Sequence, residues 1–224
     1  IPFSKANEQI LLVENIAPYR TSKVRILNGA HTSMVPFSIM LGIETVRYAI
    51  DNKVAGGFIK NIIYNEIIPI LDLPEEQLKE YTEDVLDRFR NPFIKHYLSS
   101  IALNSISKFK VRVLPSLLDY VEKFNQIPKG ITFSLACLIR FYKGDWNNQK
   151  LPVNDDEAII NEFRNIWENN DYQQISHSVL KNINFWEQDL TKVNQLENEV
   201  EKALRLIDEY GIEKSYEMYS NQTI

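Results

Sequence analysis

The chain has 224 residues, of which 44% are hydrophobic and 25% are charged, so it can bury a core of ordinary globular size. Its formal net charge of −5 argues against a nucleic-acid-binding or anionic-membrane surface, since both need a concentrated positive field. No apolar run reaches the roughly 18 residues that a membrane-spanning helix requires, and the amino end carries no signal-peptide pattern. The single cysteine, Cys137, rules out an internal disulfide and fits a reducing cytoplasm.

The amino-terminal twenty residues differ from the rest of the chain. The segment "ILLVENI" at residues 10–16 is the best candidate for a short strand. The chain begins with Ile1 rather than methionine, so we expect it to be part of a longer protein. Residues 1–20 are then a linker or the end of a preceding domain, and residues 21–224 form one domain.

Apolar residues three and four apart, together with only 7 glycines, predict that this domain is mainly α-helical. The clearest predicted helices cover residues 53–71, 75–89, 111–125, 129–143, 155–168 and 194–210. Pro74 and Pro128 stand before two of these helices, and Gly144 and Gly211 stand where two of them should end.

The polar segment 145–156 predicts an exposed loop between two helices. At its end, Asn154 followed three residues later by Glu157 resembles a capping box at the start of the helix 155–168.

The segment "KVRILNGAHT" at residues 23–32 places three polar side chains in an apolar stretch. In an α-helix each residue turns by about 100°, so Asn28 would lie about 140° and His31 about 80° from Lys23. The three side chains can then face one cleft. In that cleft, Asn28 and His31 would hydrogen-bond the same oxygen and polarise it.

Apolar neighbours give Lys23 a second expected property. Val24, Ile26 and Leu27 would partly desolvate its ammonium group, which lowers the pKa of a lysine and suits it to proton exchange near neutral pH. A simpler reading makes Lys23 solvent-exposed, ends a short helix at Asn28 and Gly29, and uses His31 to cap the next helix.

Positive charge is concentrated in two acid-free segments. Residues 88–118 contain no Asp or Glu but six basic residues, namely Arg88, Arg90, Lys95, Lys108, Lys110 and Arg112, with His96 among them. Residues 15–43 also lack acids and carry Arg20, Lys23 and Arg25. Either these charges pair with acids elsewhere in the fold, or the two segments meet at a cleft that binds a small carboxylated substrate.

Several motifs are absent from the sequence. The glycines give neither G-x-G-x-x-G nor a Walker A loop, so the chain has no nucleotide-phosphate cradle of its own. There is no G-x-S-x-G elbow, and the three histidines, His31, His96 and His177, lack the spacing of a helical metal pair.

Residues 23–31 read K-x-x-x-x-N-x-x-H, the signature of the long-chain polyol and sugar-acid dehydrogenases, and the chain therefore resembles this mannitol dehydrogenase family. Flanking segments extend the resemblance over nearly the whole chain and bring it closer to the sugar-acid members. They are "NEIIPILDLP" at 65–74, "RFRNPFIKHYLSSIALNSISKFKVRVLPSLLDY" at 88–120, "FYKG" at 141–144 and "LPVNDDE" at 151–157.

The resemblance implies that residues 21–224 are the helical C-terminal substrate domain of a two-domain NAD-dependent enzyme. The fold of this domain would be of the 6-phosphogluconate-dehydrogenase-like C-terminal type. A Rossmann domain that binds most of the NAD would precede it. Lys23 would be the general acid/base, and Asn28 and His31 would bind the reacting oxygen. The implied reaction reduces the ketone of D-tagaturonate with NADH to give D-altronate, or the reverse.

Two departures from the polyol-oxidising members matter for the substrate. Where those members read N-P-x-I-x-D and then an arginine and D-G-S-x-K, this chain has His96 at the aspartate position and Ser100 near the arginine, while Lys108 keeps the lysine. We expect Lys108 and His96 to help hold a substrate carboxylate.

Other functions stay open at this point. Within the family, the alternatives are a fructuronate reductase and a polyol dehydrogenase. Outside enzymes, the chain could be a non-catalytic helical module whose basic segments dock an acidic partner, and this alternative predicts an exposed Lys23.

Overall fold

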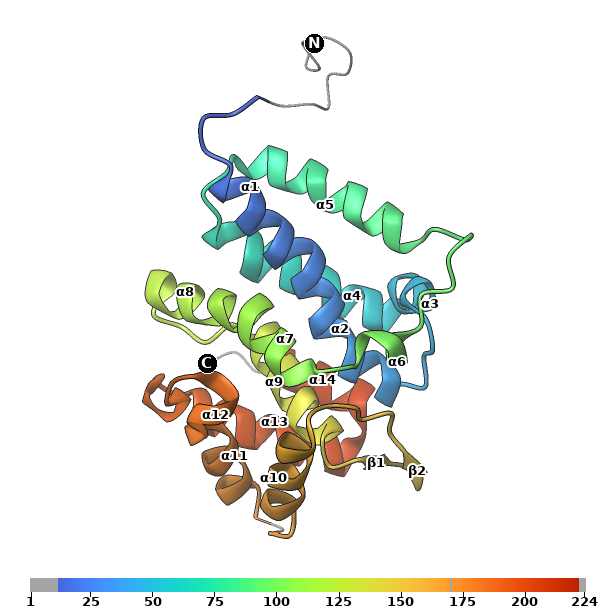
Figure 1. Ribbon diagram of the computed structural model, residues 1–224, viewed down its shortest axis with the longest axis vertical. Coiled ribbons are helices and arrows are strands. Elements are labelled where there is room, and N and C mark those ends of the chain that lie inside the picture. The colour runs from blue at the N-terminus through green and yellow to red at the C-terminus, as the bar shows by residue number, and fades with distance from the viewer. Residues whose placement is uncertain (1–11, 170, 222–224) are drawn as a thin grey trace.

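The computed structural model describes residues 12–169 and 171–221, and these residues are mainly α-helical, as the sequence predicts (Figure 1). The helices of the first half are α1 (Ala17–Ser22), the π-helix η2 (Lys23–Asn28), α2 (Gly29–Met40), α3 (Val46–Asp51), α4 (Lys53–Asn61), the π-helix η3 (Ile62–Ile67), the 3₁₀-helix η4 (Ile68–Ile70), α5 (Glu75–Phe89), α6 (Leu98–Ile101) and α7 (Ser105–Arg112). The second half contains α8 (Leu114–Phe124), α9 (Lys129–Phe141), strands β1 (Asp145–Trp146) and β2 (Gln149–Lys150), α10 (Glu157–Trp167), α11 (Tyr172–Lys181), α12 (Ile183–Trp186), the 3₁₀-helix η5 (Leu190–Lys192), α13 (Leu196–Tyr210) and α14 (Ile212–Ser220).

Most of the predicted helices are present. α5 has the predicted bounds, and α4, η3 and η4 together cover the predicted helix 53–71. The predicted helix 111–125 begins late, at Leu114, because residues up to Arg112 belong to the separate helix α7 and Pro115 lies in the first turn of α8.

The strand predicted at residues 10–16 is wrong over its described part. Residues 12–16 are irregular and exposed, and residues 10 and 11 lie outside the described residues. A strand needs a neighbouring strand for its backbone hydrogen bonds, and the sheet found in the described ranges consists of β1 and β2 alone.

The capping box predicted at Asn154 is also wrong. α10 begins at Glu157 after Asp156, and no side chain caps it. The backbone carbonyl of Asn154 instead accepts the N–H of Asn104 at 2.9 Å, and the Asp155 carboxylate accepts the Tyr142 hydroxyl. The loop 145–156 is largely exposed, as predicted, and it contains the short hairpin β1–β2.

The core is built around α9. Every residue from Gly130 to Phe141 is buried, and most of these residues are apolar, as expected for a helix at the centre of a core. α2, α13 and α14 pack against it. Phe133 on α9 contacts a group of aromatic rings from three other helices, Phe37, Phe58, Tyr216 and Tyr219.

A buried carboxylate holds the amino end of α9. Glu66 accepts the backbone N–H of Gly130 at 2.6 Å and that of Ile131 at 2.7 Å. These are two of the N–H groups that a helix leaves without a partner at its start. A Cβ on Gly130 would lie 2.7 Å from Cγ1 of Ile62, so glycine permits this close approach.

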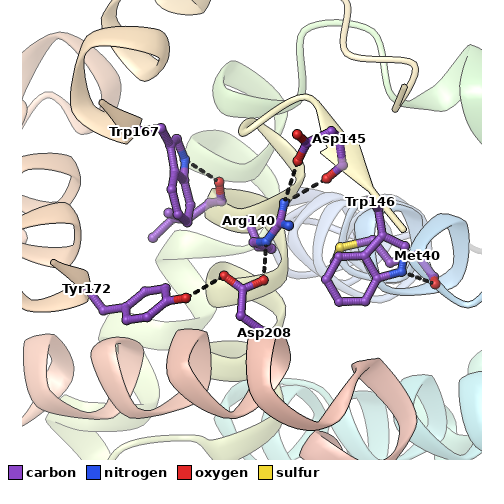
Figure 2. A network of polar contacts seen from close by, with 8 residues as sticks. Met40, Arg140, Asp145, Trp146, Trp167, Tyr172 and Asp208 are labelled. Atoms are coloured by element: carbon purple, nitrogen blue, oxygen red, sulfur yellow. Dashed lines mark hydrogen bonds and ion pairs between the residues drawn. The ribbon is translucent and has the colours of Figure 1, made fainter. Parts of the chain in front are cut away.

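The carboxyl end of α9 is held by a buried arginine (Figure 2). The Arg140 Nε donates to Asp208 on α13 at 2.5 Å, and Nη1 donates to the Asp145 carbonyl at 2.8 Å. The Tyr172 hydroxyl donates to the other oxygen of Asp208 at 2.7 Å. The network therefore joins α9, α11, α13 and the hairpin.

Two indoles flank the Arg140 guanidinium. Its central carbon lies 5.0 Å from the ring centroid of Trp146 and 5.7 Å from that of Trp167. The Trp146 Nε1 donates to the Met40 carbonyl at 2.8 Å, which ties the hairpin to the end of α2 (Figure 2).

Candidate functional site

α1, η2 and α2 form one continuous helical segment that carries the predicted signature residues. Its backbone is α-helical or π-helical from Ala17 to Met40, and both Asn28 and Gly29 have right-handed helical dihedral angles. The simpler reading is therefore wrong in ending a helix at Asn28 and Gly29 and in making His31 a cap, but it is correct in making Lys23 solvent-exposed.

A π turn lies between Lys23 and His31. The Gly29 N–H donates to the Val24 carbonyl five residues earlier, and such turns occur frequently at functional sites. Because a π turn contains more residues than an α turn, the angle of about 140° expected between Lys23 and Asn28 does not apply here. The wider turn reduces the rotation per residue, which brings Asn28 toward the Lys23 face.

Gly29 permits a close helix contact at the signature. A Cβ at this position would lie 3.2 Å from the carbonyl oxygen of Arg112, at the end of α7. Both α5 and α7 also contact η2. The signature residues thus lie between these two helices.

Lys23 is exposed and lines an open hollow of about 580 Å³ between the first helical segment and α5. Tyr81, Asp84 and Arg88 are among the other residues that line it. The predicted desolvation of Lys23 by its apolar neighbours is wrong for this chain, because Ile26 turns into the core and leaves the ammonium group uncovered.

Asn28 is half-buried, and its backbone carbonyl accepts the Thr32 hydroxyl at 2.9 Å. The hollow at Lys23 does not include Asn28 or His31. A cleft shared by all three side chains stays a prediction.

His31 has a defined environment. Its ring stacks on Phe89, the last residue of α5, with centroids 4.1 Å apart, and meets the His96 ring edge-on at 5.1 Å. Burial is the main cause that lowers the pKa of His31 to about 4, and the nearby His96 and Arg112 lower it further. The imidazole is therefore neutral at pH 7. Its Nε2 is buried and has no hydrogen-bond partner among the described residues, so one hydrogen-bonding position of the ring is unsatisfied.

The two residues predicted to hold a carboxylate lie on this side of the fold. His96 is exposed and touches His31, as just described. Lys108 on α7 is half-buried, and its Nζ donates to the Ile101 carbonyl at 2.9 Å. Burial lowers the pKa of Lys108, the charge of Arg112 lowers it further, and the charge of Asp155 opposes both effects.

Some of the basic residues do pair with acids. Lys110 contacts Glu187 at 2.6 Å, and Arg25 contacts Asp119 at 2.5 Å. The reading of paired surface charge is correct for these residues. It does not describe Arg112, for which no acidic partner is found within the described ranges.

The sequence argument gave no individual role to Phe89 or Arg112. Phe89 could not be assigned because its contact with His31 joins residues distant in the chain. For Arg112 a signal was available, since it stands four residues after Lys108 and therefore on the same helix face.

Across residues 12–169 and 171–221, no cluster of His, Cys, Asp and Glu could hold a metal ion. The described helices include none that is long and apolar enough to cross a membrane.

Residues 15–208 match the mannitol dehydrogenase C-terminal domain. The chain belongs to this family. Among solved structures, the family fold is found in the mannitol 2-dehydrogenase of Pseudomonas fluorescens, solved in a ternary complex with NAD and D-mannitol, with a TM-score of 0.83 and 17% identity over 94% of this chain and 42% of that one. A D-sorbitol dehydrogenase solved in substrate-free form gives a TM-score of 0.80 and 21% identity over 96% of this chain and 43% of that one.

Relatives of this family member are named altronate oxidoreductase. The protein from Bacillus subtilis (strain 168) is 42% identical over 99% of this chain, and that from Yersinia pestis is 41% identical over 94%. The chain spans about half the length of these curated relatives, 45% in both cases.

Proposed function

We propose that this chain is the C-terminal catalytic domain of an NAD-dependent tagaturonate reductase, which interconverts D-tagaturonate and D-altronate. The observation that carries the proposal is the 42% identity to an altronate oxidoreductase over 99% of the chain. Residues 21–224 would be the substrate domain, and residues 1–20 would connect it to the remaining half.

NAD would be held mainly outside this chain. None of the seven glycines stands in a G-x-G-x-x-G turn, so these residues do not form a dinucleotide cradle. A Rossmann domain elsewhere in the protein would bind the cofactor, whose chemistry is the exchange of a hydride with the substrate carbon.

Lys23 is proposed as the general acid and base. In the reducing direction, its ammonium group gives a proton to the alkoxide oxygen that forms on the substrate, and in the oxidising direction its amine takes the proton back. The exposed position of Lys23 in an open hollow leaves it accessible to substrate from the side of α5.

Asn28 and His31 are proposed to hold the same oxygen. The neutral His31 ring is fixed by Phe89 and has a free Nε2, so it can donate a hydrogen bond to the developing negative charge. Such a donor stabilises the transition state more than the ground state, because the charge on the oxygen grows during the reaction.

Lys108 and His96 are proposed to help hold the substrate carboxylate. The test compares binding of D-altronate and of an uncharged polyol to the full-length protein carrying Lys108→Ala. A greater loss for altronate is expected, and an equal loss for both ligands would remove this role.

The activity itself is tested by following NADH oxidation by the intact protein with D-tagaturonate, D-fructuronate and several ketoses. Fastest turnover of D-tagaturonate is expected. Preference for D-fructuronate or an uncharged ketose would favour one of the two related activities, and no turnover of any of them would favour the non-catalytic module.

A further inference from the structure

Arg112 is a basic residue whose charge the described fold does not neutralise. It is the last residue of α7 and is half-buried, and burial lowers the pKa of its guanidinium group. Lys110 on the same helix is paired with Glu187 at 2.6 Å. No ion pair is found for Arg112 in the part of the chain that the structure describes, although removing its charge from water is costly without a partner.

The surroundings of Arg112 are those of the proposed reaction site. Its carbonyl lies against Gly29, between Asn28 and His31 in the signature. Its charge acts on His31 and on Lys108, which precedes it by one helical turn. The His31 Nε2, buried and unpartnered among the described residues, belongs to the same group.

One nearby acid balances only part of these charges. Asp155 favours the charged form of Lys108, but it forms no ion pair with Lys108 or Arg112 among the described residues. Two positive side chains four residues apart on a helix repel each other, and a bound anion would remove this repulsion.

We propose that the Arg112 guanidinium binds the carboxylate of the substrate, with Lys108 as a second contact, while Asn28 and His31 hold the reacting oxygen. This inference rests on the proposed function, because it takes the substrate to be a sugar acid. A guanidinium donates two parallel hydrogen bonds to a carboxylate, which fixes the orientation of the substrate as well as its charge. Arg112 would thus select sugar acids over neutral sugars, since a neutral ligand leaves the half-buried guanidinium without an ionic partner.

The experiment uses the full-length protein with Arg112→Gln, Arg112→Lys and, as a matched control on the same helix, Lys110→Gln. D-tagaturonate is compared with D-tagatose, in which a hydroxymethyl group replaces the carboxylate, and equilibrium binding of D-altronate is measured. Arg112→Gln should lower kcat/KM for D-tagaturonate and altronate affinity by about 10- to 100-fold, mainly through KM. Arg112→Lys should be intermediate, and Lys110→Gln should match the wild type.

Several results would overturn the role of Arg112. They are wild-type affinity of Arg112→Gln for D-altronate, an equal loss of activity toward D-tagatose, or a loss of NADH affinity that points to an ion pair with another domain. Wild-type turnover tests the proposed function separately. If the protein reduces a different keto sugar acid, the Arg112 comparison is made with that acid, whereas a protein that reduces only neutral ketoses overturns both proposals.

Discussion

The imidazole of His31 stacks on the phenyl ring of Phe89, with centroids 4.1 Å apart and ring planes inclined by 29°. This contact joins the signature helix to the end of α5 and covers one face of the imidazole with apolar surface. It explains in part why His31 is desolvated, and desolvation is the largest cause of its lowered pKa.

Stability should therefore depend on pH through His31. Its pKa is about 4 in the folded protein, against 6.5 for an ordinary histidine, so the unfolded chain binds a proton more readily. The contribution of His31 to stability is complete above pH 6.5 and is lost as the pH falls toward 4, by up to about 3 kcal/mol. The free energy of unfolding of the full-length protein, measured with denaturant at several pH values, should fall less steeply between pH 6.5 and 4 in His31→Gln than in the wild type. A His31→Gln curve parallel to the wild type would contradict it.

Glu66 should produce the opposite slope. Burial raises its pKa to about 7 from 4.5, even though the N–H groups of Gly130 and Ile131 favour the charged form. The folded protein then binds the proton more tightly than the unfolded chain, so this contribution declines as the pH rises from 4.5 to 7, by up to about 3 kcal/mol. Glu66→Gln should remove this decline in the free energy of unfolding. The rise in stability with pH that His31 produces should then be steeper than in the wild type. Equal slopes in Glu66→Gln and wild type would show that the folded carboxyl is not shifted.

Lys23→Ala in the full-length protein should lower turnover by on the order of 100-fold or more and flatten the alkaline limb of the pH–rate profile. NADH affinity should stay nearly unchanged, because Lys23 acts on the substrate oxygen. Lys60→Ala, at an exposed position of α4, serves as the control and should behave as the wild type. Near-normal turnover of Lys23→Ala would end the assignment of Lys23.

Asp208→Ala should strongly destabilise the fold. The Arg140 side chain is only 7% exposed, so the substitution leaves a buried guanidinium without its main partner and should cost about 3–5 kcal/mol. Glu201→Ala on the same helix breaks an exposed pair with Arg205 and should cost about 1 kcal/mol or less. Thermal unfolding of both variants measures the difference. Similar losses would mean that the Arg140 network adds little beyond a surface ion pair.

The helices were largely predictable because their signals are local. Apolar spacing and the punctuation by Pro74, Pro128 and Gly211 define α5, α9 and α13 closely, and Gly211 has the positive φ of 75° that favours glycine at a helix end. The capping box at Asn154 failed because a distant residue, Tyr142, determines where Asp155 lies. The residues next to Asn154 in the sequence do not indicate such a contact.

The candidate site was predictable only in part. Lys23, Asn28 and His31 could be selected from their spacing, but their geometry depends on a π turn that residue periodicity does not reveal. The ring contact of His31 with Phe89 and the approach of Arg112 to Gly29 depend on how α5 and α7 pack. The expected apolar cover of Lys23 failed for the same reason, since Ile26 faces the core instead.

The π turn at Lys23–Asn28 also sets the rotational phase between the two ends of the signature helix. If the same residues formed an ordinary α-helical ladder instead, the residues on one side of the turn would be rotated by roughly 100° relative to those on the other side. Both ends of the helix could then keep their packing only if the helix were strained between them. The angle between Lys23 and His31 about the helix axis thus depends on the backbone hydrogen bonds of the π turn, and a side-chain substitution alone would not change it.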